Sequence, residues 1–142
     1  MQEDGEAIVD VERLRSLPLF GELDHHDLAI VARHVREASA AAGEVLFQEG
    51  TIPYELLVIE EGTAEIVKDG RTIGSIGPGD VVGEMGLLRR QRRMATVRAT
   101  SPLRAVAVAA DDLAAIEAEM PEIAAELGQI VRTRSEPPTA PA

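Results

Sequence analysis

The sequence predicts an α+β protein that consists mainly of short β-strands, packed as a sandwich, a barrel or a jelly roll. Between Glu44 and Ile76, glycine or proline interrupts the chain every few residues, and the runs between them are aliphatic or β-branched. Apolar residues at helical spacing lie nearer the two ends of the chain. Many short strands with regular turns and helices outside them are typical of packed antiparallel sheets.

Six segments carry the strand pattern. They are Val45–Phe47, Leu56–Ile59, Ala64–Val67, Thr72–Ile76, Ala95–Thr100 and Leu103–Ala109. The dipeptide Asp69-Gly70 predicts a tight hairpin between the third and fourth segments. Ser101 and Pro102 predict the turn that joins the last two.

Two helices are predicted before the strands. The first lies within residues 9–17 and is ended by Pro18, and Asp24 is expected to begin the second. The apolar positions of the two helices are, in order, Val11, Leu14, Leu17, Leu28, Val31 and Val35. The polar residues 1–7 are expected to form a flexible tail.

Two further helices are predicted after the strands. Asp111 is expected to cap the first, and Pro121 suits the first turn of the second. Their apolar positions are, in order, Leu113, Ile116, Met120, Ile123, Leu127, Ile130 and Val131. The proline-rich residues 135–142 are expected to form a second flexible tail.

The composition is that of one globular domain. The 142 residues are 45% hydrophobic but only 2% aromatic, so aliphatic side chains and alanine must fill the core. There is no cysteine, hence no disulfide, and the sequence shows no long apolar run and no signal peptide. We therefore expect a cytoplasmic protein without membrane insertion, with its core within residues 17–133.

The charge is distributed unevenly along the chain. The net charge is −11, but residues 85–110 contain six arginines and no acidic residue, which leaves −17 for the rest. An acidic body with one basic spot repels nucleic acid overall and concentrates positive potential at that spot. The sequence therefore predicts no nucleic-acid binding, and a single basic region whose ligand is anionic.

That basic region belongs to a distinctive stretch, Gly83 to Ala99, which reads GEMGLLRRQRRMATVRA. Glycine lets the backbone approach a ligand closely, and the planar guanidinium of Arg93 suits phosphate. Glu84 would repel a free phosphate, but its carboxylate can accept a hydrogen bond from a sugar hydroxyl. The residue types therefore indicate a phosphate that is joined to a sugar.

This stretch resembles the phosphate-binding cassette of the cyclic-nucleotide-binding domains, as found in the catabolite activator protein and in regulatory subunits of cyclic-AMP-dependent kinase. Three other segments resemble the strand-and-turn segments of that family in the same order: AAGEVLFQEG, ELLVIEEGTAEIV and IGPGDVVGE. The resemblance implies a single domain over residues 1–142. It also implies an eight-stranded jelly roll with N-terminal helices, a short cassette helix and C-terminal helices.

The resemblance also implies a ligand and its site. The ligand would be cyclic AMP, with cyclic GMP as the other candidate, and the protein would use no cofactor. Arg93 would bind the phosphate and Glu84 the ribose. The remaining residues implied for the site are Gly83, Met85, Gly86, Leu87, Met94, Ala95, Ile66, Ile76 and Val82, with Arg132 and Arg134 on a lid helix.

Met94 leads to a further prediction about which base, adenine or guanine, the site prefers. Relatives selective for cyclic GMP have a hydroxyl residue directly after the cassette arginine, and it can accept a hydrogen bond from the guanine amino group. The thioether of Met94 is a weak acceptor, so cyclic AMP should be preferred. Thr96 lies two positions further along the expected strand and leaves cyclic GMP as an alternative.

Other functions suit parts of the same sequence. The arginines of the tip, Arg89, Arg90 and Arg92, suit an interaction module that binds an acidic protein partner. The chain is also consistent with the isolated regulatory domain of a larger protein. The C-terminal helix is a candidate for the contact between the two copies of a homodimer. A nucleophile–base constellation is lacking, which predicts a non-catalytic protein, and the three histidines are not spaced as a metal site.

Overall fold

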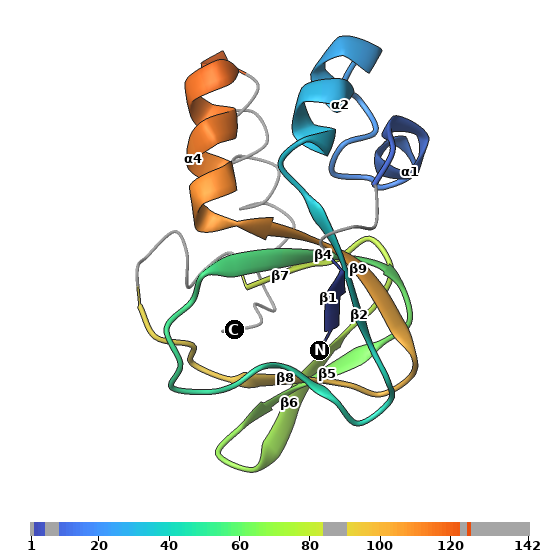
Figure 1. Ribbon diagram of the computed structural model, residues 1–142. Coiled ribbons are helices and arrows are strands. Elements are labelled where there is room, and N and C mark those ends of the chain that lie inside the picture. The colour runs from blue at the N-terminus through green and yellow to red at the C-terminus, as the bar shows by residue number, and fades with distance from the viewer. Residues whose placement is uncertain (1, 5–8, 84–90, 123–124, 126–142) are drawn as a thin grey trace.

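The computed structural model describes residues 2–4, 9–83, 91–122 and 125, and it has helices on one side of two β-sheets (Figure 1). The helices are α1 (Val11–Arg15), α2 (His25–Ala32) and α4 (Ala110–Glu119). The strands are β1 (Gln2–Asp4), β2 (Arg36–Ala40), β3 (Val45–Phe47), β4 (Glu55–Glu61), β5 (Ala64–Lys68), β6 (Arg71–Ile76), β7 (Val81–Val82), β8 (Thr96–Ala99) and β9 (Leu103–Ala109).

All pairs of neighbouring strands are antiparallel. One sheet has the order β1-β2-β9-β4-β7 and the other the order β3-β8-β5-β6. The predicted mainly-β roll of eight strands is confirmed by β2 to β9. The cassette helix predicted after Gly83 lies outside the described residues.

The five-stranded sheet separates two cores. Successive side chains of a strand point to opposite faces, so Leu56 and Val58 of β4 pack toward the helices whereas Leu57 and Ile59 pack toward the other sheet. The helix-facing core comprises Val9, Leu14, Leu17, Leu19, Phe20, Leu28, Val31, Val35, Leu56, Val58, Val81, Val106, Val108, Ile116 and Met120. The roll interior comprises Ala38, Ala40, Leu46, Phe47, Leu57, Ile59, Ala64, Ile66, Val82, Ala95, Val97, Ala99, Leu103, Ala105 and Ala107.

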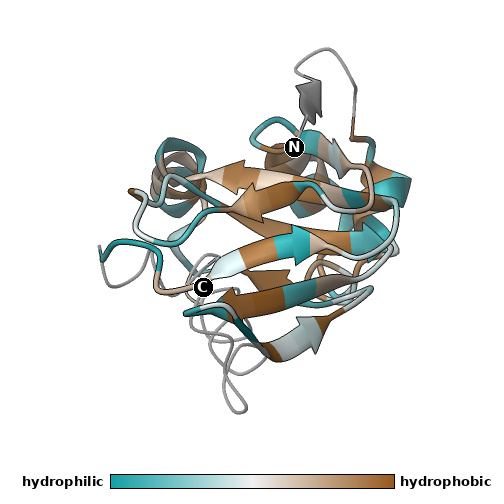
Figure 2. Ribbon diagram, turned by 90° about the horizontal axis from the view of Figure 1, so that it is seen from below, coloured by the Kyte–Doolittle hydropathy of each residue, from teal (hydrophilic) through white to brown (hydrophobic). Residues whose placement is uncertain are grey.

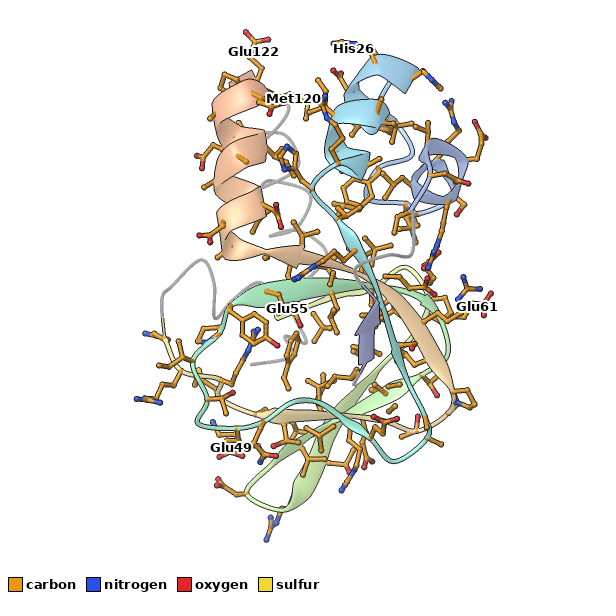
Figure 3. The ribbon with its side chains drawn as sticks, viewed as in Figure 1. His26, Glu49, Glu55, Glu61, Met120 and Glu122 are labelled. Atoms are coloured by element: carbon orange, nitrogen blue, oxygen red, sulfur yellow. The ribbon has the colours of Figure 1, made fainter. Side chains whose placement is uncertain are left out.

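Hydropathy follows these two layers. In Figure 2 the hydrophobic colour runs along the strands of both sheets, and hydrophilic residues alternate with it or occupy the connections. In the helices the buried residues follow helical spacing: Leu28 and Val31 of α2 and Ile116 of α4 pack in the helix-facing core. Met120, at the far end of α4, lies between α4 and α2 (Figure 3) and belongs to the helix-facing core.

Several local predictions are confirmed. The side chain of Asp24 accepts a hydrogen bond from the backbone N–H of Asp27 at 2.8 Å and caps α2. Leu28 and Val31 are fully buried, as the predicted apolar stripe requires. At the β5–β6 hairpin, Asp69 and Gly70 have φ values of 52° and 79°, the left-handed conformations of a tight two-residue turn.

Other predictions are wrong. Asp111 does not cap α4, because β9 runs directly into the helix and the N-cap residue is Ala109, which has no capping side chain. Residues 2–4 were expected in a flexible tail but form β1, which pairs with β2. The core also begins before residue 17, because Val9 and Leu14 are buried in it.

Charged side chains join α1 to the sheet. The guanidinium of Arg13 donates to both carboxylate oxygens of Glu60, at 2.8 and 2.5 Å, and lies 3.5 Å from Glu37. The hydrogen bonds to Glu60 raise the pKa of Arg13 well above its usual range. Because this pair is largely buried and bidentate, it fixes α1 against β4 more firmly than an exposed ion pair would.

Polar contacts also join the end of α2 to α4. The ring of His34, just after α2, has its Nδ1 3.4 Å from Asp112 and its Nε2 3.5 Å from Glu119, and Arg33 lies 3.3 Å from Glu119. Within the described ranges no three histidine or acidic side chains gather as a metal site. None of the described helices is long and apolar enough to cross a membrane.

Candidate functional site

The most unusual side chain of the roll is that of Arg93, which is buried although it carries a charge. Only 3% of the residue is exposed. Its Nη1 donates to the backbone oxygen of Gly83 at 2.6 Å, and its Nη2 donates to the backbone oxygen of Glu55 at 2.5 Å. A buried charge needs such polar contacts, because desolvation without them is expensive. The edge of the guanidinium is therefore held in a fixed direction.

An aromatic ring supports the flat face of the same guanidinium. The Cζ atom of Arg93 lies 3.8 Å from the centre of the Phe47 ring. A cation over an aromatic face is attracted by the negative potential of the ring, and burial strengthens that attraction. The ring and the two carbonyl oxygens together restrict both the plane and the rotation of the guanidinium.

Gly83 is the residue that permits this arrangement. Its φ is +93°, a conformation that side chains disfavour. A Cβ atom there would lie 2.6 Å from Cε2 of Phe47 and 2.8 Å from Nη1 of Arg93. Glycine is thus required by the backbone conformation and by the close approach of two side chains.

The backbone on both sides of Arg93 is fixed as well. The N–H of Arg93 donates to the oxygen of Thr51, and the N–H of Gly50 donates to the oxygen of Arg93, both at 2.8 Å. The neighbouring Arg92 is exposed, and its Nη1 donates to the oxygen of Gly50 at 2.9 Å. Two adjacent arginines therefore have opposite environments, one inside the roll and one on its surface.

Glu55 contributes to the site in two ways. Its backbone oxygen is one of the acceptors of Arg93, and its carboxylate is completely buried. That carboxylate lies 3.7 Å from the guanidinium of Arg36 at the start of β2. Glu55 begins β4 (Figure 3), and it contacts Arg93 through its backbone and Arg36 through its side chain.

The structure brings several of the predicted apolar site residues together. Val82, Ala95 and Ile66 belong to the roll interior with Phe47, and Ile76 is partly buried against it. Met94 differs, because 43% of it is exposed whereas its neighbours Arg93 and Ala95 are buried. The part assigned to Met94 in base selection stays a prediction.

The other predicted site residues lie outside the described residues. They are Glu84, Met85, Gly86 and Leu87 of the cassette and Arg132 and Arg134 of the expected lid.

Sequence reasoning missed Phe47 and Glu55. Both belong to segments that were predicted as strands or strand ends, but their contacts with Arg93 join residues that are far apart in the chain. The composition held one signal for Phe47: it is one of only two phenylalanines in a chain poor in aromatic residues.

The chain matches one known protein family over more than half of its length. The family model described as "Cyclic nucleotide-binding domain" matches residues 37–119. This chain belongs to that family. The match runs from β2 to the end of α4 and includes both strands that hold Phe47 and Glu55, as well as Gly83 and Arg93.

Individual relatives agree with this assignment. The cAMP-dependent protein kinase regulatory subunit of Yarrowia lipolytica is 36% identical over 84 residues, which are 59% of this chain and 22% of that protein. The N-terminal domain of a transcriptional regulator from Streptomyces coelicolor is 32% identical with a TM-score of 0.71, and the match covers 88% of this chain and 91% of that chain.

A third similarity shows the fold alone. The regulatory subunit of a cAMP-independent protein kinase A from Trypanosoma brucei has a TM-score of 0.75 at 20% identity, over 89% of this chain and 45% of that chain. This chain spans 22% to 34% of the length of the first four curated relatives that it matches.

Proposed function

We propose that this domain is a sensor that binds cyclic AMP without catalysis and signals through its C-terminal helices. The observation that carries the proposal is the buried guanidinium of Arg93, held by Phe47 and two carbonyl oxygens inside a cyclic nucleotide-binding domain. A guanidinium is matched in shape and charge to a phosphate, and its attraction to one is strong where water is excluded. Membership of the family supports a cyclic nucleotide as the molecule that carries this phosphate.

The expected roles follow from the family resemblance together with the chemistry of each group. Arg93 donates to the exocyclic phosphate oxygens, together with backbone N–H groups near Gly86 and Ala95. Glu84 accepts a hydrogen bond from the ribose 2′-hydroxyl. Ile66, Ile76 and Val82 would contact the apolar faces of the sugar and base, and two of these three are already buried in the roll interior.

Signalling would involve the helices after β9. α4 follows the roll directly, and its first N–H, that of Ala110, donates to the oxygen of Tyr54 next to Glu55 at 2.8 Å. A movement of Glu55 and Arg93 on ligand binding would therefore be transmitted to the start of α4 through the neighbouring residue Tyr54. In this proposal the final helix closes over the ligand, and the altered position of the helices shifts the equilibrium between two states that a partner protein distinguishes.

Calorimetric titration of the purified protein with cyclic AMP tests the proposal. Arg93→Ala should weaken binding about tenfold to a hundredfold, because a hydrogen bond to a charged group contributes ~1.5–3 kcal/mol. Arg92→Ala is the matched control: it removes the adjacent, exposed arginine and should leave the affinity unchanged. Circular dichroism must show that both variants are folded.

Two results would contradict the proposal. The first is a wild-type protein that binds neither cyclic AMP nor cyclic GMP, which the fold alone permits. The second is equal affinity in the Arg93→Ala variant and the wild type. A cyclic GMP titration run in parallel tests the preference predicted from Met94, because tighter binding of cyclic GMP would overturn that preference and leave the phosphate assignment intact.

A further inference from the structure

The contact between Phe47 and Arg93 depends on an irregularity in β3. Val45 pairs with Arg98 and Phe47 pairs with Val97, so the register shifts between these two residues of β3. In a regular strand consecutive side chains point to opposite faces, yet Leu46 and Phe47 are both buried. A β-bulge of this kind redirects a side chain. Here it turns the ring of Phe47 into the roll interior, where the guanidinium of Arg93 lies on it.

The Phe47 ring restrains the guanidinium of Arg93 in a way that its hydrogen-bond acceptors do not. The backbone oxygens of Gly83 and Glu55 hold its edge, through Nη1 and Nη2. They restrict its plane only loosely, because an N–H···O hydrogen bond tolerates bending and weakens steeply only below about 120°. A flat ring at 3.8 Å does fix the plane, and it attracts the charge as an aliphatic side chain of similar size would not.

We propose that Phe47 is a positioning residue that acts through Arg93 and sets the affinity for the phosphate. The inference rests on the proposed function of Arg93. An arginine side chain has several rotatable bonds, and immobilising it during binding reduces affinity. Phe47 immobilises it beforehand, so the ligand meets a guanidinium that is already oriented.

The decisive variant is Phe47→Leu, which keeps an apolar side chain and removes the aromatic face. We expect the dissociation constant for cyclic AMP to rise about twofold to tenfold, since ordering one such side chain reduces affinity by that factor. Phe47→Tyr keeps the ring and should stay within about twofold of the wild type. Phe47→Met serves in place of Phe47→Leu if the latter does not fold.

The chain offers a matched control in its other phenylalanine. Phe20 is also buried, with 3% of the residue exposed, but it belongs to the helix-facing core. Phe20→Leu should lower the melting temperature about as much as Phe47→Leu does and leave the affinity for cyclic AMP unchanged. If Phe20→Leu weakens binding as much as Phe47→Leu, the effect is general loosening and the positioning role is wrong.

A double-mutant cycle tests whether Phe47 acts through Arg93. Arg93→Lys replaces the planar group by an ammonium that needs no flat support. When Phe47→Leu is added to the Arg93→Lys variant, the dissociation constant should therefore change by less than about twofold. An equal loss in both backgrounds would mean that the ring affects the ligand by another route and would overturn the proposal.

A readout without ligand separates this inference from the proposed function. In the wild type, the ¹⁵N-labelled guanidinium of Arg93 should give resolved, ring-shifted NMR signals, because its rotation is restricted next to Phe47. Phe47→Leu should abolish the shift and average the signals. Averaged signals in the wild type overturn the positioning role even if cyclic AMP binds. Resolved signals that Phe47→Leu averages support it even if no nucleotide binds.

Discussion

The two faces of the five-stranded sheet bury different kinds of side chain. Each core has fifteen buried apolar members among the described residues, but the helix-facing core contains no alanine whereas the roll interior contains seven. The roll interior also surrounds a buried arginine, and no charged residue is among the buried members described for the helix-facing core. One face of the same sheet is thus covered by large apolar side chains, and the other by alanines mixed with larger side chains, beside the buried Arg93.

We infer that this difference separates the stability of the fold from the proposed binding of a ligand. Burying a valine, leucine or isoleucine side chain contributes roughly 1.5–3 kcal/mol, and an alanine contributes much less. We infer that the helix-facing core supplies most of the hydrophobic stabilisation. The contacts of the roll interior instead hold Phe47, Gly83 and Arg93 in one arrangement.

The largest effect should come from truncating a side chain of the helix-facing core. Leu28 is fully buried on α2, and Leu28→Ala should lower the free energy of unfolding by about 2–5 kcal/mol. The affinity for cyclic AMP should not change at a temperature where the variant is folded. Urea denaturation measures the free energy of unfolding, and calorimetric titration measures the affinity. A tenfold loss of affinity would show that the helix-facing core also affects binding.

Gly83→Ala should have a smaller effect on stability but a clear effect on the site. The new Cβ would clash with Phe47 and Arg93, and the strained backbone costs about 1–3 kcal/mol. Gly43→Ala is the control, because Gly43 has a φ of +91° but no atom lies within 4 Å of the place that its Cβ would take. Both variants should lose stability from the backbone, whereas only Gly83→Ala should also weaken cyclic AMP binding. Equal affinities would show that Gly83 serves the backbone alone.

The smallest effect is expected on the outer face of the four-stranded sheet, away from both cores. There the guanidinium of Arg98 donates to Glu65 at 2.8 and 3.0 Å, and with Thr72 it lowers the pKa of that carboxyl. A lowered pKa adds stability above the ordinary glutamate range, and that stability is lost as the pH falls through the lowered value.

Arg98→Gln should therefore move the pKa of Glu65 back toward its ordinary value, as NMR titration would show. It should leave cyclic AMP binding unchanged. A Glu65 titration that is the same in the variant and the wild type would mean that Arg98 does not govern this carboxyl.

Most of the fold could be predicted from local patterns. The hairpin at Asp69-Gly70 and the cap at Asp24 depend on neighbouring residues, so the sequence was sufficient there. β2 was missed because Arg36–Ala40 contains small and charged residues without β-branched ones, and its strand conformation comes from pairing with β9. The start of α4 was misplaced because an acidic residue suggested a cap, whereas β9 continues to Ala109 and the helix begins at the next residue without a side-chain cap.

The candidate site was predictable where a residue type was rare or a motif recognisable. Arg93 and Gly83 were identified in this way, and the structure adds that they touch each other. The support of Arg93 by Phe47 and the backbone of Glu55 could not be derived, because strand pairing across the roll brings these residues together. Contacts of this kind depend on register, and a bulge changes register without a clear mark in the sequence.

The position of β9 has a consequence for how the chain folds during synthesis. In the five-stranded sheet β9 lies between β2 and β4, although it is made after every other described strand. A nascent chain that has not yet released residues 103–109 holds β2 and β4 with open edges, and open edges invite pairing with other chains. The ribosome must therefore deliver Ala109 before the sheet can close, so folding follows translation of this segment instead of accompanying it. Chaperone demand should be greatest in that interval.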